Sequence, residues 1–140
     1  MKSIINNIRN LEYQISVEIE KLKSKYDIGY LGLDLMNSRH AEYSFEARKV
    51  YSKLTTYLEG LSDDELYKLI SLVYAGRDPQ NVTDRGGFNE HYIVTKMHDV
   101  RGRKDCINAI GNKVGSLSNY LDAAQTNANA QGFNIDTDFN

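Results

Sequence analysis

The first 26 residues carry apolar side chains at steps of three and four positions. The apolar positions are Ile4, Ile8, Leu11, Ile15, Ile19, Leu22 and Tyr26. Charged residues such as Arg9, Glu12 and Glu18 fall between them. This spacing predicts one long amphipathic helix over residues 4–26, with the charged residues on its outer faces.

The apolar stripe of this helix has two interpretations. In the favoured one, the stripe packs along the other helices of its own chain. In the other, part of it is the seam of a homodimer or higher homo-oligomer, formed by Ile4, Ile8, Leu11, Ile15 and Leu22. A strict heptad repeat fails at Glu18, so an extended coiled coil is not predicted.

The clearest local signal lies at Ser62 and Glu65. Their spacing is that of a capping box, in which each side chain satisfies a backbone N–H of the first helical turn. A helix is therefore predicted over residues 63–75, ended by Gly76 and Pro79. A preceding apolar stripe predicts another helix over residues 41–59, and the short connection between the two favours antiparallel neighbours.

Three more helices are predicted after a loop that spans residues 78–88. The loop would carry Arg85-Gly86-Gly87 at its tip. The helices cover residues 89–101, 105–110 and 116–125. The first of them would bury Tyr92, Ile93, Met97 and Val100.

Two segments lack a helical pattern. Residues 27–39 are apolar and punctuated by glycine, and we interpret them as a connector that tucks Leu31, Leu33 and Leu35 under the helices. Residues 126–140 are mostly polar, so we expect a disordered, mobile tail. The predicted fold is all-α, a compact bundle of five to six helices in one domain over residues 1–125.

Residues 58–124 resemble a known family. The matching residues are Leu61-Ser62-Asp63-Asp64-Glu65, Leu69, Leu72, Gly76-Arg77-Asp78 and Leu117-Ser118-Asn119-Tyr120-Leu121-Asp122. This pattern is similar to the uncharacterised family catalogued as domain of unknown function 3775. The resemblance implies an α-helical fold and no particular activity.

Composition narrows the class of protein. The chain has 140 residues, a net charge of −2 and one cysteine, Cys106. This balance disfavours whole-surface attraction to nucleic acid, and a single cysteine leaves no internal disulfide. No apolar run reaches the roughly 18 residues of a membrane span, so a cytoplasmic protein is expected. Abundant Asn, Lys, Ile and Tyr fit an AT-rich genome, such as that of a low-GC bacterium or its phage.

Candidate catalytic and metal-binding residues are few. His91 and His98 are seven residues apart on a predicted helix, a rise of about 10 Å that is too long for two ligands of one ion. Cys106 follows Arg103, Lys104 and Asp105 near a predicted helix start, where the two cations and the helix dipole would lower the pKa of its thiol. A buried, inert cysteine is the favoured interpretation. We therefore expect no catalytic residue, no metal and no cofactor.

The segment between Gly76 and Gly115 is rich in basic residues interleaved with glycine. The candidate anion or nucleotide site consists of Arg77, Arg85, Lys96, Arg101, Arg103 and Lys104. Arginine forks bind phosphate in a bidentate manner, and glycine frees backbone N–H groups to do the same. Five acidic residues share the segment, so local ion pairs are the alternative.

The sequence thus favours a non-enzymatic binding protein. It would dock on a protein partner or hold a phosphate-bearing small molecule, as a phage or mobile-element inhibitor of host defence does. One alternative is a nucleic-acid-binding regulator that uses residues 77–104, although duplex nucleic acid normally requires a stronger basic face. Another is a small enzyme that uses Cys106 or His98.

Overall fold

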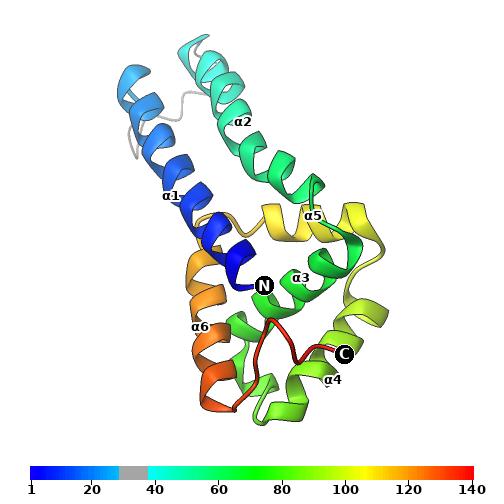
Figure 1. The fold of residues 1–140 in the computed structure, drawn as a ribbon. Helices are drawn as coiled ribbons and strands as arrows, with labels where there is room; N and C mark the ends of the chain where they lie inside the picture. The colour runs from blue at the N-terminus through cyan, green and yellow to red at the C-terminus, as the bar shows by residue number, and fades with distance from the viewer. Residues whose placement is uncertain (29–37) are drawn as a thin grey trace.

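A computed structural model describes residues 1–28 and 38–140, and it confirms the predicted all-α class (Figure 1). The α-helices of the described residues are α1 (Lys2–Lys25), α2 (Ser38–Glu59), α3 (Asp63–Arg77), α4 (Arg85–Val94), α5 (Arg103–Gly111) and α6 (Leu117–Ala130). A short 3₁₀ helix, η1 (Pro79–Asn81), follows α3, and a π-helical segment, η2 (Thr95–Asp99), continues α4. Residues 1–28 and 38–140 contain no β-strand. The predicted connector, with Leu31, Leu33 and Leu35, lies largely outside the described residues.

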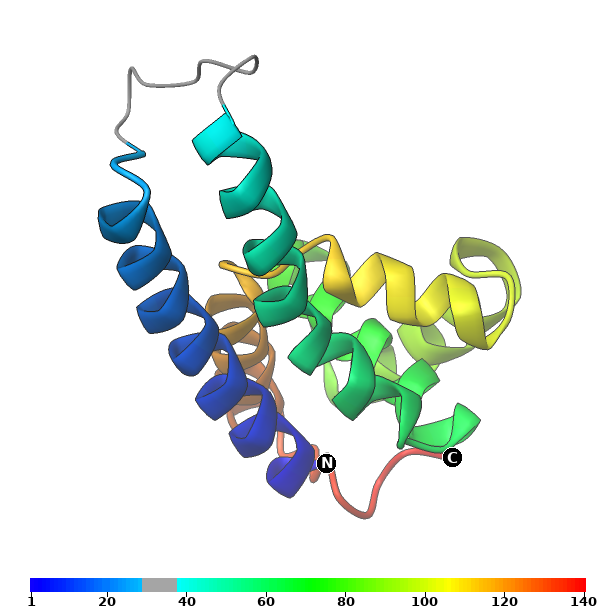
Figure 2. The ribbon, with the colours of Figure 1, turned by 90° about the horizontal axis from the view of Figure 1, so that it is seen from above.

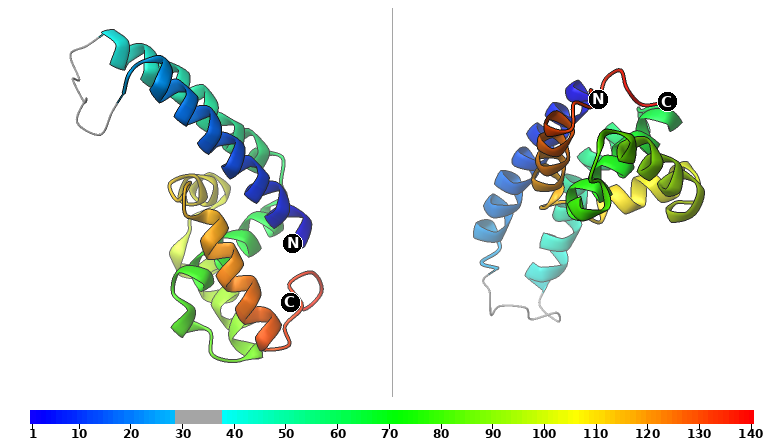
Figure 3. Two further views of the ribbon diagram at one scale, coloured as in Figure 1. Left: turned by 90° about the vertical axis from the view of Figure 1, so that its left-hand side faces the viewer. Right: turned by 90° about the horizontal axis from the view of Figure 1, so that it is seen from below.

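The first two helices form an antiparallel hairpin that extends beyond the rest of the molecule (Figures 1 and 3). Ion pairs join them, with Lys53 Nζ 2.6 Å from Glu18 Oε1 and Lys25 Nζ 3.4 Å from Glu46 Oε1. The N-terminal half of α1 also packs on α6, as seen from above in Figure 2.

The apolar stripe of α1 packs within its own chain, as the favoured interpretation requires. Ile4, Ile8 and Ile15 are buried in the core, and Leu22 is partly buried against it. Of the five residues of the alternative seam, Leu11 and Leu22 are only partly buried, and a homo-oligomer stays a prediction.

Helix α3 lies at the centre of the other elements and begins as predicted. The Ser62 Oγ accepts a hydrogen bond from the Glu65 N–H at 3.2 Å, and the Ser62 N–H donates to Glu65 Oε2 at 2.8 Å. Its end differs from the prediction, because Gly76 lies inside the helix and does not terminate it. Gly76 is buried where α3 crosses α6, and an ideal Cβ built on it would lie 1.7 Å from the backbone oxygen of Tyr120. The absence of a side chain at Gly76 therefore allows α3 and α6 to approach each other closely.

Glu12 holds the start of α6 from a distance of about a hundred residues in sequence. The pattern of α1 predicts an outward-facing side chain, but only 9% of Glu12 is exposed. Its carboxylate accepts hydrogen bonds from the N–H groups of Gly115, Leu117 and Ser118, at 2.8, 3.0 and 3.0 Å. These donors would otherwise be unpaired at the positive end of α6, so a side chain of α1 caps another helix.

The expected mobile tail is instead packed on the helices. Helix α6 continues to Ala130, and the last ten residues fold back beside the N-terminus (Figures 1 and 2). Phe133 stacks on Phe88 with ring centroids 4.8 Å apart, and Phe139 meets Tyr92 edge-on at 5.4 Å. Ordering the tail costs conformational entropy, which its polar residues alone would not offset. The burial of a few aromatic rings supplies the missing stabilisation.

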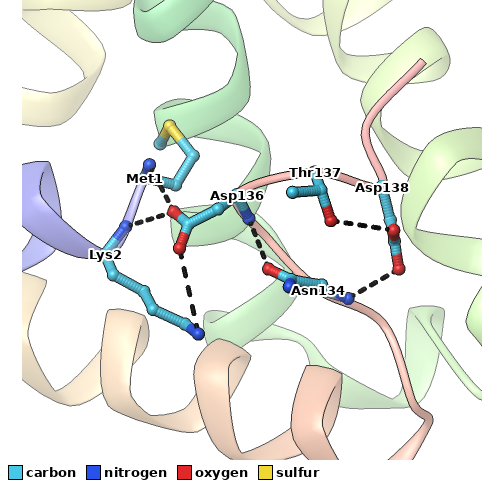
Figure 4. A network of polar contacts seen from close by, with 6 residues as sticks. All are labelled: Met1, Lys2, Asn134, Asp136, Thr137 and Asp138. Atoms are coloured by element: carbon cyan, nitrogen blue, oxygen red, sulfur yellow. Dashed lines mark hydrogen bonds and ion pairs between the residues drawn. The ribbon is translucent and has the colours of Figure 1, made fainter.

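Two aspartates fasten the tail (Figure 4). Asp136 accepts hydrogen bonds from the Met1 ammonium group at 2.7 Å and from the Lys2 N–H at 2.9 Å. Asp138 accepts from the Asn134 N–H at 2.8 Å and from Arg85 at 2.9 Å. These contacts hold the pKa of both carboxyl groups below the usual aspartate value.

Acid should therefore release the tail. A carboxyl group whose pKa is lowered by folding stabilises the fold above its unfolded pKa, and that contribution is lost as the pH falls through the folded value. We expect the amides of residues 131–140 to lose protection from hydrogen exchange, corrected for the intrinsic rate, below about pH 4. In Asp136→Asn the loss should already be present at pH 7. Equal protection at pH 3 and pH 7 in the unaltered protein would contradict this account.

Candidate functional site

The six basic residues of the predicted anion site do not converge on one pocket. Arg85 pairs with Asp138 of the tail, with their atoms 2.9 Å apart. Arg103 Nη1 lies 2.9 Å from Asp63 Oδ1, and its other terminal nitrogen donates to a backbone carbonyl of α2. These partners are far away in sequence, and they direct the arginines towards different elements.

The remaining basic residues also separate. Lys96 lies over the rings of Tyr67 and Tyr92, 5.6 and 5.8 Å from their centroids. Arg101 and Lys104 are exposed at either side of the start of α5. Arg77 lines a polar cleft at the end of α3, and Arg85 lines a different one beside the C-terminal tail.

The predicted loop tip is in fact the beginning of a helix. Arg85-Gly86-Gly87 form the first turn of α4, because the Asp84 side chain accepts a hydrogen bond from the Gly87 N–H at 2.9 Å. An earlier start places Phe88 on the inner face of α4, together with Tyr92 and Thr95. Their burial sets the rotation of the helix.

This rotation leaves apolar side chains of α4 and η2 in solvent. Ile93 and Met97, which the sequence predicts in the core, are 51% and 68% exposed, and Val94 is exposed beside them. The predictions for Tyr92 and Val100 are confirmed, since both are buried.

The polar cleft has a volume of about 490 Å³. Side chains from α3, α4, η1 and η2 and from the turn after α3 line it: Tyr74, Arg77, Asp78, Asn81, His91, His98 and Asp99. The π-helical turn of η2 brings His98 and Asp99 to this cleft, and such turns occur often at functional sites. The cleft thus gathers residues that sequence spacing alone does not bring together.

Arg77 is fixed from two sides. Its Nε donates to Asp78 Oδ2 at 2.7 Å, and its guanidinium carbon lies 4.8 Å from the centroid of the Tyr74 ring. A second cation, Lys113 Nζ, lies 5.0 Å from the same centroid. Burial and the neighbouring Arg77 lower the pKa of Lys113, while burial raises the pKa of Tyr74. The phenol therefore stays protonated beside two positive groups.

His91 is half-buried at the cleft. Its Nδ1 lies 3.2 Å from Ser71 Oγ on α3 and 3.3 Å from Thr95 Oγ1 at the start of η2. Burial lowers the pKa of His91, although the carboxylates of Asp99 and Asp78 oppose the shift. Sequence reasoning missed this arrangement, and the available signal was Ser71, a polar residue within an otherwise apolar run of α3.

The other catalytic and metal-binding candidates are not supported. Cys106 is fully buried, and burial raises the pKa of its thiol to about 11, so it is protonated and inaccessible. The cleft contains His98 but not Cys106. Among the described residues, no group of three or more His, Cys, Asp or Glu side chains is placed to share a metal ion.

Comparisons with known proteins find nothing similar: no family model, no curated protein and no solved structure matches the chain. Within residues 1–28 and 38–140, no helix has both the length and the apolar character needed to cross a bilayer.

Proposed function

We propose that the protein is a non-enzymatic binding protein that holds a small phosphate-bearing ligand of nucleotide size in the cleft around Arg77. The supporting observation is the meeting of a braced arginine, a tyrosine ring and a half-buried histidine in one cleft. Its volume of about 490 Å³ falls within the range of small-molecule sites, roughly 300–1,000 Å³.

Arg77 is suited to bind phosphate. Because Asp78 engages its Nε, the two terminal nitrogens of the guanidinium group are left for a ligand. A fork of this kind donates two parallel hydrogen bonds to phosphate oxygens. The bracing by Asp78 and Tyr74 reduces the side-chain entropy that binding would otherwise cost.

The charge balance of the site favours a nucleotide over a bare anion. The positive charges of Arg77 and Lys113 are matched by the negative charges of Asp78 and Asp99. A carboxylate repels phosphate but accepts hydrogen bonds from hydroxyl and amino groups. A ligand that carries phosphate together with such donors satisfies both kinds of group.

Binding without turnover is favoured over catalysis and over nucleic-acid recognition. The only thiol is buried and protonated, which argues against nucleophilic chemistry at Cys106. Three of the basic residues of the segment 77–104 are paired with aspartates, which leaves no continuous positive face of the kind that duplex nucleic acid requires. A protein that sequesters a nucleotide messenger in this way would be suited to inhibit a host defence.

Isothermal titration with AMP, ADP and cyclic AMP tests the proposal. We expect Arg77→Ala to weaken binding of the preferred nucleotide by about 10- to 100-fold, the effect of losing a charge-assisted hydrogen bond. Arg48→Ala is the matched control, because it removes the same charge from an exposed position on α2, outside the cleft. Absence of nucleotide binding by the unaltered protein, or equal losses in both variants, would contradict the proposal.

A further inference from the structure

The two hydroxyl groups beside His91 determine which of its ring nitrogens carries the proton. Ser71 and Thr95 are buried, with 2% and 0% of their surfaces exposed. Within the described part of the chain, His91 Nδ1 is the one hydrogen-bond partner of either hydroxyl. A buried hydroxyl group that donates to no acceptor is costly.

Nδ1 must therefore act as the acceptor. Each hydroxyl has one proton to donate, and an unprotonated Nδ1 offers one lone pair, which accepts from one of the two hydroxyls or is shared between them. A proton on Nδ1 would remove this lone pair and leave both hydroxyl protons without a partner. In the neutral ring the proton then resides on Nε2, at the edge of the imidazole opposite the two buried hydroxyl groups, and His91 is one of the residues that line the cleft.

We infer that His91 is held as the neutral Nε2–H tautomer and is the specificity-determining donor of the cleft, which requires a hydrogen-bond acceptor on the ligand. The ligand-reading role rests on the proposed function, whereas the tautomer does not. Arg77 lies on α3 and His91 on α4. A ligand with its phosphate on Arg77 would then reach His91 through a separate acceptor, such as a ring nitrogen or a carbonyl oxygen of a nucleobase.

The charged groups around the ring affect whether the imidazole is neutral or protonated. Asp78 and Asp99 favour a protonated imidazolium, whereas Arg77 and burial oppose it. Burial is the largest of these influences, and it keeps the ring neutral near pH 7. A neutral N–H distinguishes ligands by the position of an acceptor, and Arg77 distinguishes them by charge.

Imidazole ¹⁵N NMR of the full chain without ligand tests the tautomer. We expect the His91 signals near pH 7 to show a proton on Nε2 and none on Nδ1. The same measurement on Ser71→Ala and Thr95→Val should show an increased fraction of the other tautomer. A proton on Nδ1 in the unaltered protein would overturn the inference.

Two substitutions of His91 test its role in ligand recognition. An asparagine offers its amide near the position of Nδ1, whereas a glutamine reaches the position of Nε2. We expect the ratio of the affinities for AMP and inorganic phosphate to fall about tenfold in His91→Asn, the effect of one lost hydrogen bond to a ligand, and to be largely restored in His91→Gln. Thermal unfolding of both variants shows whether the fold is retained.

The outcomes separate the two proposals. If the unaltered protein binds AMP and neither substitution changes the affinity ratio, the role of His91 is overturned and the proposed function stands. If the unaltered protein binds neither probe, the proposed function falls together with the ligand-reading role. The NMR result decides the tautomer in both cases, even if a variant fails to fold.

Discussion

Gly76→Ala is expected to lower the free energy of unfolding by about 3 kcal/mol or more. The added Cβ would lie 1.7 Å from the Tyr120 oxygen and 2.5 Å from its carbonyl carbon. Both are backbone atoms of α6, so no side chain can rotate away. The helices must instead move apart along the largest interhelical contact of the molecule. Urea denaturation followed by circular dichroism measures the loss.

Gly111→Ala is the matched control for this prediction. Gly111 is the last residue of α5, and an added Cβ there would meet no atom within 4 Å. Alanine restricts the unfolded chain, so this variant should be neutral or more stable by up to about 1 kcal/mol. A similar loss of stability in both variants would show that the close approach of α3 and α6 is not the cause.

The second large effect is expected from Glu12→Ala, with a loss of about 3 kcal/mol in the free energy of unfolding. The substitution leaves the N–H groups of Gly115, Leu117 and Ser118 without their acceptor. It also removes a negative charge from the positive end of α6. Thermal or urea unfolding measures the change, and Glu12→Gln should lie between the alanine variant and the unaltered protein.

Glu18→Ala provides the comparison for a carboxylate on the same helix. Glu18 pairs with Lys53, and both side chains are about two-fifths exposed. Exposed ion pairs contribute little, so we expect a loss below about 1 kcal/mol. If Glu12→Ala costs no more than Glu18→Ala, the capping of α6 by α1 does not contribute to stability.

Local signals predict those elements whose stabilising contacts are also local. The capping box of Ser62 and Glu65 lies within one helical turn, and it correctly predicts the start of α3. The apolar spacing of α1 likewise predicts its buried face. Gly76 shows the limit, because the same residue type ends helices and permits helices to touch. Only the approach of Tyr120 distinguishes the two roles.

The tail and the cleft depend on contacts between distant residues. Phe133 is ordered by Phe88, and Arg85 is neutralised by Asp138, 53 positions along the chain. The spacing of residues along the sequence does not reveal these contacts. The polar composition of the tail therefore predicts disorder, whereas the tail is packed. The sequence predicts Arg77 as an anion-binding residue of the cleft, but it does not predict that His91, His98 and Asp99 join it, because these three are brought there by α4 and η2.

The position of α3 governs how the molecule can come apart. The helix contacts α4, α5, α6, η1 and η2, whereas the α1–α2 hairpin meets the other helices chiefly through α6 and α5. Separation of the hairpin would leave α3 enclosed by these neighbours, whereas displacement of α3 would expose all five of them at once. A partly folded state would therefore keep residues 63–140 together and release the hairpin first.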